Sequence, residues 1–92
     1  MKPFDWNSQK NILLKLSRGI GFEDVVNAIA DGHLLDTLQH PNLNWYAKQK
    51  VYIVEIDGYA YSVPFVENTE VCFLKTIYPS RKYTKQYLSE KE

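Results

Sequence analysis

The chain has 92 residues, a length that accommodates one domain with a single hydrophobic core and leaves no room for a second. Its 45% apolar content, with 14% aromatic residues, predicts a folded chain and excludes an intrinsically disordered one. The 11 basic and 11 acidic residues give a net charge of zero, which excludes nucleic-acid binding through bulk charge but not through a local basic patch.

The residue inventory also bears on cofactors and compartment. The single cysteine, Cys72, cannot form an intrachain disulfide, and neither His33 nor His40 has neighbours at metal-binding spacing. The sequence contains no glycine-rich phosphate loop, so we expect no metal and no other cofactor. It has no apolar signal segment and no run approaching the ~18 apolar residues that span a bilayer. These features predict a cytoplasmic protein without membrane contact.

Two helices are predicted in the first third of the chain. Asn7 is a candidate N-cap, and apolar residues at helical spacing continue as far as Gly19, which predicts a helix over Ser8–Arg18. The second helix follows at once and ends at Gly32, and its apolar residues at i, i+3, i+4, i+7 and i+8 are Phe22, Val25, Val26, Ile29 and Ala30. The short connection predicts an αα-hairpin.

The apolar pattern of the first helix comes from Ile12, Leu13 and Leu16, with Leu14 adjacent. Because lysines favour the solvated face of an amphipathic helix, Lys10 and Lys15 are assigned to that face.

The middle of the chain has the pattern of a β-meander. Leu34–Leu38 is ambiguous between a strand and a helical extension, and His40–Asn44 has the composition of a loop. Strands are predicted over Lys50–Ile56 and Tyr59–Val66, and Asp57-Gly58 between them is typical of a type I′ turn.

A third strand and a final helix complete the prediction. After a turn at Glu67–Glu70, Val71–Tyr78 has strand composition, and the residues from Ser80 onward predict a short helix. Pro64 conflicts with a regular meander because proline cannot donate a ladder hydrogen bond. We therefore expect a bulge or a frayed end near it.

The strongest local signal for function is a basic corner near the C-terminal end. Lys75, Arg81, Lys82 and Lys85 lie between positions 71 and 88, where the sequence has no acidic residue. Arg81 and Lys82 begin the predicted last helix, where cations are disfavoured by ~0.3–1 kcal/mol each. An arginine fork, a lysine and helix-start amides would suit a phosphate group, although the same charges also fit an ordinary solvated face.

Tyrosines on the predicted sheet leave two alternatives open. Exposed members of this group could stack on nucleic-acid bases or pack against a protein partner, and they are Tyr52, Tyr59 and Tyr61.

Three segments of the chain resemble the BrnT-like toxins of the RelE/ParE superfamily. The opening Phe4-Asp5-Trp6-Asn7, with Lys10 beyond it, is similar to a phenylalanine-x-tryptophan opening before a helix. The segment Arg18-Gly19-Ile20-Gly21-Phe22-Glu23 resembles the family's His-Gly-Ile-x-Phe-Glu linker. Near the other end, Pro79-Ser80-Arg81-Lys82 resembles its Ser-Ala-Arg-Lys, which a short basic helix with a tyrosine follows.

The resemblance implies a RelE-like α+β fold over residues 1–92 as a single domain. Two N-terminal helices would pack on a three- to four-stranded antiparallel sheet with a short C-terminal helix. It also implies the toxin component of a type II toxin–antitoxin module, a metal-independent ribonuclease that inhibits translation. Its partners would be RNA, such as mRNA on or off the ribosome, and a co-encoded antitoxin protein.

The resemblance assigns catalytic roles to Arg81 and Lys82, whose charges would offset the charge that develops on a phosphate during attack by a ribose 2′-hydroxyl. We add Lys75 and Tyr78 as catalytic candidates, because both lie near the end of the predicted third strand.

Three positions depart from the family pattern. Arg18 stands in place of the linker histidine, Thr76 in place of a strand arginine, and Gln49 in place of a glutamate. The alternative to a nuclease is therefore a non-catalytic protein-interaction module with a degenerate active site.

Overall fold

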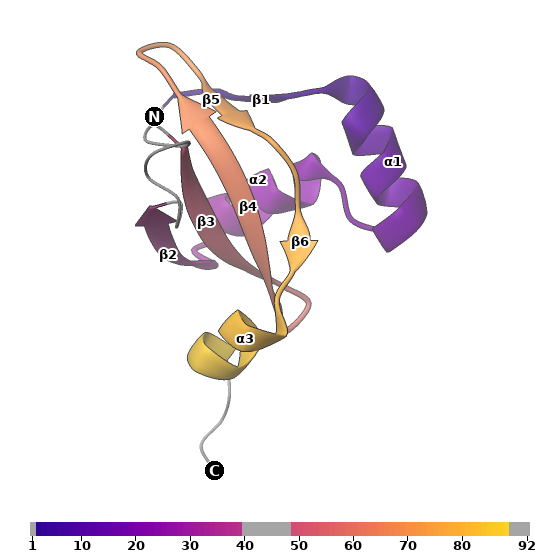
Figure 1. Cartoon of the computed structure of the whole chain (residues 1–92), viewed down its shortest axis with the longest axis vertical. Helices are drawn as coiled ribbons and strands as arrows, with labels where there is room; N and C mark the ends of the chain where they lie inside the picture. The colour runs from indigo at the N-terminus through magenta and orange to yellow at the C-terminus, as the bar shows by residue number, and fades with distance from the viewer. Residues whose placement is uncertain (1, 40–48, 89–92) are drawn as a thin grey trace.

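The computed structural model describes residues 2–39 and 49–88. The described chain forms an α+β fold in which a mixed sheet is packed against helices (Figure 1). The elements in chain order are β1 (Phe4–Trp6), α1 (Ser8–Arg18), α2 (Phe22–Ala30), β2 (Leu34–Gln39), β3 (Gln49–Ile56), β4 (Tyr59–Glu67), β5 (Cys72–Leu74), β6 (Tyr78–Pro79), α3 (Arg81–Tyr83) and the π-helical turn η1 (Thr84–Leu88). None of the helices in the described ranges has the length and apolar character needed to cross a membrane.

The predicted helix boundaries are confirmed, and local capping explains them. The side chain of Asn7 accepts a hydrogen bond from the Lys10 amide at 2.9 Å, which satisfies one of the free donors at the start of α1. Gly19 ends α1 in the left-handed region at φ 73°, where a side chain would be strained. Gly32 follows α2 in the same region, at φ 86°.

The sheet has the strand order β1-β5-β4-β3-β2, with β6 also paired to β4. β1 runs parallel to β5, and the other neighbours are antiparallel. The prediction of a three- to four-stranded antiparallel sheet is therefore wrong in two respects. The sheet has more strands, and it is mixed because β1 is parallel to its neighbour. The missed strand β1 has only three residues, too few to show a period of two.

The hairpin and the ambiguous segment are now assigned. Asp57 and Gly58 both have positive φ, 54° and 80°, as a type I′ turn requires. Leu34–Leu38 belongs to strand β2, which pairs with β3. The predicted loop His40–Asn44 lies outside the described residues.

The third predicted strand, Val71–Tyr78, is wrong as a single element because it is divided into β5 and β6. Its break lies opposite Pro64. The Lys75 amide donates to the Pro64 carbonyl at 2.8 Å, but proline has no N–H to return the second bond of that pair. The pairing then resumes one residue out of register, at Ser62 with Tyr78. The irregularity expected near Pro64 is thus a bulge in the neighbouring strand.

The two faces of the sheet have different covers. The inner face packs against α2 and the Leu14 side of α1, and its buried cluster includes Phe22, Val25, Val54, Val63, Phe65, Leu74 and Ile77. On the outer face, buried Ile53 and Ala60 lie where the C-terminal segment α3–η1 crosses the sheet. The rest of the outer face is more open.

Hydrogen bonds fix the C-terminal segment on the outer face. The Thr84 hydroxyl donates to the Ser80 carbonyl at 2.7 Å and accepts from the Ala60 amide at 2.8 Å. The Tyr87 hydroxyl donates to Asp36 of β2 at 2.5 Å, and this bond lowers the pKa of Asp36 and raises the pKa of Tyr87. The predicted terminal helix is confirmed, and it is tied to both β4 and β2.

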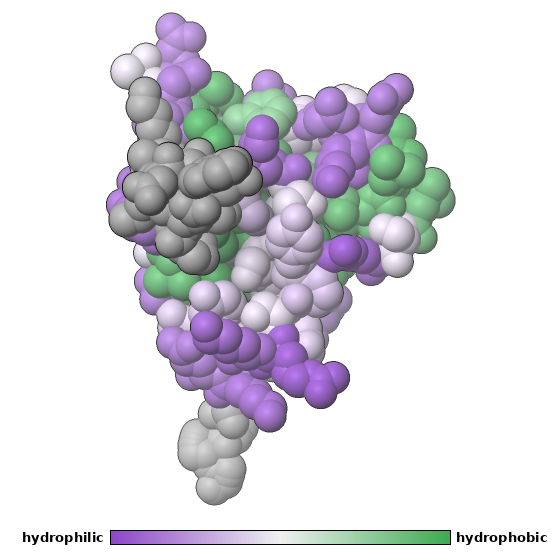
Figure 2. Space-filling view, viewed as in Figure 1, coloured by the Kyte–Doolittle hydropathy of each residue, from purple (hydrophilic) through white to green (hydrophobic). Residues whose placement is uncertain are grey.

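Helix α1 turns its polar stripe toward the rest of the protein. Asn11 is only 6% exposed, whereas Ile12, Leu13 and Leu16 are 57%, 61% and 80% exposed. The apolar surface of α1 is green on the right of Figure 2. Lys10 and Lys15 are both exposed, as predicted, and the Lys15 ammonium also pairs with Glu23 at 3.2 Å.

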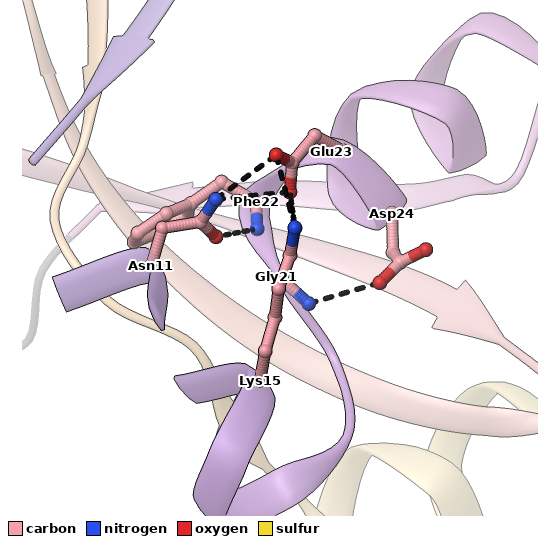
Figure 3. A network of polar contacts seen from close by, with 6 residues as sticks. All are labelled: Asn11, Lys15, Gly21, Phe22, Glu23 and Asp24. Carbon is pink, nitrogen blue, oxygen red and sulfur yellow. Dashed lines mark hydrogen bonds and ion pairs between the residues drawn. The ribbon is translucent and has the colours of Figure 1, made fainter. Parts of the chain in front are cut away.

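A polar network explains this orientation (Figure 3). Asn11 Oδ1 accepts the Phe22 amide at 2.7 Å, and Asn11 Nδ2 donates to both carboxylate oxygens of Glu23 at 3.0 Å. Asp24 caps the Gly21 amide at 2.9 Å. A Cβ at Gly21 would lie 2.5 Å from Lys15 Cε and 2.8 Å from Asn11 Oδ1, so a larger residue there would displace side chains of this network.

Candidate nucleic-acid interface

Three cation–aromatic pairs follow the segment from β5 to α3. Lys75 lies 5.6 Å from the centroid of the Phe73 ring, Arg18 lies 5.8 Å from Tyr78, and Lys82 lies 5.3 Å from Tyr83. We call these six residues the cation–aromatic strip. Each distance is within the range in which a cation is attracted to the face of an aromatic ring.

Strand register places the first two aromatic rings of the strip on the outer face. Phe73 is paired with Val66, and Tyr78 is paired with Ser62. Directly paired residues project to the same face of a sheet, and Ser62 and Val66 share one face because they are four residues apart on β4. The strip therefore begins on the face opposite α2.

Arg18 contributes to the strip from the end of α1. Its guanidinium donates to the Ile77 carbonyl at 2.8 Å and lies beside the ring of Tyr78, whose side chain is exposed. That bond uses one of the five N–H donors of the guanidinium. Arg18 was not predicted to be a site residue from the sequence. The available signal was its position in the linker, where the family resemblance places a histidine.

Beside α3, two aromatic rings of the strip line a hollow. Tyr78 and Tyr83 line a hollow of about 230 Å³ together with Ser62 and Pro64. The Ser80 hydroxyl accepts the Tyr83 amide at 3.1 Å, which fixes the start of α3 beside this hollow. Arg81 and Lys82 are the first two residues of α3, and both are exposed at its edge.

Lys75 lies at the other end of the strip. It lines a hollow of about 490 Å³ with Phe73 and residues of the α1 N-terminus, among them Lys10. The six residue steps from Lys75 to Arg81 run through extended chain, a distance of up to roughly 20 Å (Figure 1). The structure thus groups Tyr78 near the beginning of α3 and places Lys75 separately, along the same strip.

The cations of the strip have no carboxylate partner within residues 2–39 and 49–88. The ion pairs in these ranges are Lys2 with Glu67, Lys15 with Glu23 and His33 with Glu55. A row of cations without paired carboxylates attracts anions. This attraction acts locally, so it does not require a net positive charge on the whole chain, which here is zero.

Other reactive groups lie away from the strip. Cys72 and Tyr52 line a hollow of about 610 Å³ on the inner side of the sheet, where Lys2 is paired with Glu67. Burial raises the pKa of the Cys72 thiol and, together with the contact to Cys72, the pKa of Tyr52. A thiol held protonated is a poor nucleophile, so this hollow does not supply one.

We next consider the histidines and possible metal ligands of the described residues. His33 Nδ1 lies 3.7 Å from Glu55, which is paired with Ala60 of β4, and His40 lies outside the described residues. The described part of the chain contains no group of three or more His, Cys, Asp or Glu side chains arranged to hold a metal. Of the sheet tyrosines, Tyr52 and Tyr61 pack against the inner core rather than lining the strip.

Two family-related positions are also placed by the structure. Thr76 lies in the bulge between β5 and β6, and Gln49 is the first residue of β3, paired with Val66. Neither position supplies a charge to the strip. The arrangement can contact phosphates through cations and stack on flat rings, and both contacts are those of single-stranded nucleic-acid binding.

Comparisons of the chain with protein-family models, with curated proteins and with solved structures find no match.

Proposed function

We propose that this protein acts on RNA as the toxin of a type II toxin–antitoxin pair in the cytoplasm. The observation that supports this proposal is the cation–aromatic strip. Each of its three rings has a cation within 6 Å, and no carboxylate is paired with these cations among the described residues. Single-stranded RNA offers the complementary groups, because its unpaired bases stack on aromatic rings while its phosphates contact cations.

The resemblance to BrnT-like toxins gives the proposal its reaction. The described chain has two helices, then antiparallel strands, then a short helix, and this order supports the proposal, whereas the strand β1 was not expected. The reaction would be attack of a ribose 2′-hydroxyl on the adjacent phosphorus, which forms a 2′,3′-cyclic phosphate and breaks the bond to the 5′-oxygen. Solvent water would take the proton from the 2′-hydroxyl and supply the one that the leaving 5′-oxygen gains. Arg81 and Lys82 would stabilise the negative charge that develops on the phosphate oxygens, as a metal ion does elsewhere.

The remaining residues would position the RNA. Tyr78 offers an exposed ring and hydroxyl between Arg18 and the start of α3. Arg18 supplies a planar fork suited to phosphate oxygens, but an arginine stays protonated and does not act as a general base. Lys75 would contact the RNA backbone at the far end of the strip. A co-encoded antitoxin would neutralise the toxin.

The test is expression of the protein alone, combined with RNA cleavage by purified protein in a chelator. We expect wild type to arrest growth and cut RNA, and the double variant Arg81→Ala/Lys82→Ala to do neither. In RNA-binding measurements, the slope of log K against log salt concentration should become shallower by about 0.7 for each phosphate contact that the double variant removes. Lys2→Ala is the matched control, because it removes a cation that is paired with Glu67 away from the strip. Unimpaired growth of cells that contain abundant folded wild type would contradict the proposal.

A non-catalytic interaction module is the second candidate, and a specific observation favours it. The positions that resemble the family's histidine and strand arginine hold Arg18 and Thr76, so the strip has cations without a general base. This candidate is a protein-interaction module, and it predicts that wild type purifies in a tight complex with a partner protein and leaves RNA intact. RNA integrity after incubation with an excess of protein separates the two.

A further inference from the structure

The apolar stripe of α1 is unlike that of an ordinary surface helix. Ile12, Leu13 and Leu16 follow Gln9 at i+3, i+4 and i+7, and all three apolar side chains are more than half exposed. The opposite stripe, with Asn11 and Leu14 buried, is held against α2 by the network in Figure 3. The helix cannot roll to bury its leucines without breaking those bonds, so the stripe is available to another molecule.

The stripe continues into a concave surface. Leu13 lines the hollow of about 490 Å³ between α1 and β5, where Phe73 supplies a second apolar wall. The two charged residues that line this hollow are lysines, Lys10 and Lys75. An apolar floor with a cationic rim is therefore formed by two elements that lie far apart in the sequence.

From this geometry we propose that the α1 stripe and the Phe73 hollow bind an amphipathic helix of a partner protein, with acidic residues beside its apolar face. Its apolar residues would pack on Leu13, Leu16 and Phe73, and its carboxylates would meet Lys10 and Lys75. Helix-in-groove recognition of this kind uses anchors at i, i+3, i+4 and i+7 on the bound helix. The proposal does not require that the protein cut or bind RNA.

Charge and shape favour this occupant over the alternatives. α1 has no acidic residue, so packing α1 against α1 of a second copy would bring like charges together. A bilayer surface is flat and cannot fill the hollow beside Phe73 as a projecting side chain can. An RNA strand lacks the apolar side chains that would cover Ile12 and Leu16.

The test uses a displayed library of helix-forming peptides selected on the whole purified chain. The variant Leu13→Asp/Leu16→Asp serves for counter-selection. We expect recovered peptides to carry apolar residues at i, i+3, i+4 and i+7 with Asp or Glu beside them. The leading peptide, made synthetically, should bind the variant about tenfold or more weakly than wild type.

Two further variants keep the test decisive. Lys10→Glu/Lys75→Glu should weaken the same peptide several-fold and remove much of its salt dependence, since charge pairs are screened by salt. Leu34→Asp changes an exposed leucine on β2 and should leave binding unchanged. Because the altered side chains of these variants are exposed, thermal unfolding should confirm that each one folds.

Four outcomes would overturn the proposal. They are a selection with no peptide that distinguishes wild type from the leucine variant, recovered peptides that are neutral or basic, leucine-dependent binding to phosphatidylserine vesicles without peptide binding, and leucine-dependent dimerisation in sedimentation.

Discussion

Helices α1 and α2 are adjacent and both amphipathic, yet only α2 buries its longest apolar stripe. In α2, Phe22 and Val25 are fully buried against the sheet. In α1, the longest apolar stripe is exposed and the buried positions are Asn11 and Leu14. An apolar stripe thus predicts a surface that can be covered. The stripe alone does not show whether the rest of the same chain or another molecule covers it.

The difference between the helices originates in the short linker. Three residues separate α1 from α2, and the first amides of α2 need acceptors. Asn11 provides one of them for Phe22 and also binds Glu23, so the beginning of α2 selects which side of α1 faces it. A few directional bonds at a close approach determine the orientation, whereas burial of the α1 leucines would have required a different linker path.

The largest expected effect is on the α2 side of the comparison. Phe22→Ala should lower the free energy of unfolding by about 3–5 kcal/mol, because it removes a fully buried ring that stacks on Trp6 at 5.7 Å. Chemical denaturation of the purified chain measures this. A loss below about 1 kcal/mol would mean that α2 does not anchor the core as described.

Asn11→Ala should have the next largest effect, a loss of about 1–3 kcal/mol. The change leaves the Phe22 amide without its acceptor and Glu23 without its amide donor. Gln9→Ala, on the exposed side of the same helix, is the matched control and should be nearly neutral. Equal losses in the two variants would show that the polar stripe does not face α2.

Much of this fold could be predicted from the sequence because its signals are local. Asn7, Gly19 and Asp57-Gly58 act within a few residues, so the first helix and the hairpin turn were placed correctly. Strand β1 could not be predicted, since β5, the strand with which it pairs, is distant in the sequence. The division of the third strand depends on Pro64, which lies opposite Lys75 on the neighbouring strand. The pattern of the third strand by itself does not show that pairing.

The candidate site was predictable to a similar extent. Tyr78, Arg81 and Lys82 were selected from composition and resemblance, and they lie along one segment. Arg18 could not be placed beside Tyr78 from the sequence, because 59 residues separate it from the carbonyl that it binds. The outward stripe of α1 was missed because periodicity does not reveal which face a polar network occupies.

Acid should weaken the α1–α2 junction. The amide of Asn11 and then other hydrogen bonds, including one from Lys15, lower the pKa of Glu23 below its ordinary value of 4.5. A depressed carboxylate pKa stabilises the fold above that ordinary value, and the contribution is lost as the pH falls through the folded-state pKa. Wild type should therefore lose its advantage over Glu23→Gln below about pH 4.5. Denaturation curves of both proteins across pH check this, and a constant difference would contradict it.

The smallest effect is expected from the exposed stripe. Leu16→Ser should change the unfolding free energy of the isolated chain by no more than about 0.5 kcal/mol, because the side chain is mostly in water. The measurement is denaturation of the chain without a partner, with Leu14→Ser as the buried counterpart. A large loss from Leu16→Ser would place that side chain in the core.

Thiol labelling tests the orientation of α1 most directly. Leu16→Cys and Leu14→Cys are each made in a Cys72→Ala background and reacted with a thiol reagent under native conditions. The account predicts that the cysteine at position 16 reacts at nearly the rate of an unfolded peptide, whereas the one at position 14 reacts only when the protein opens. Protection at position 16 with rapid labelling at position 14 would contradict it.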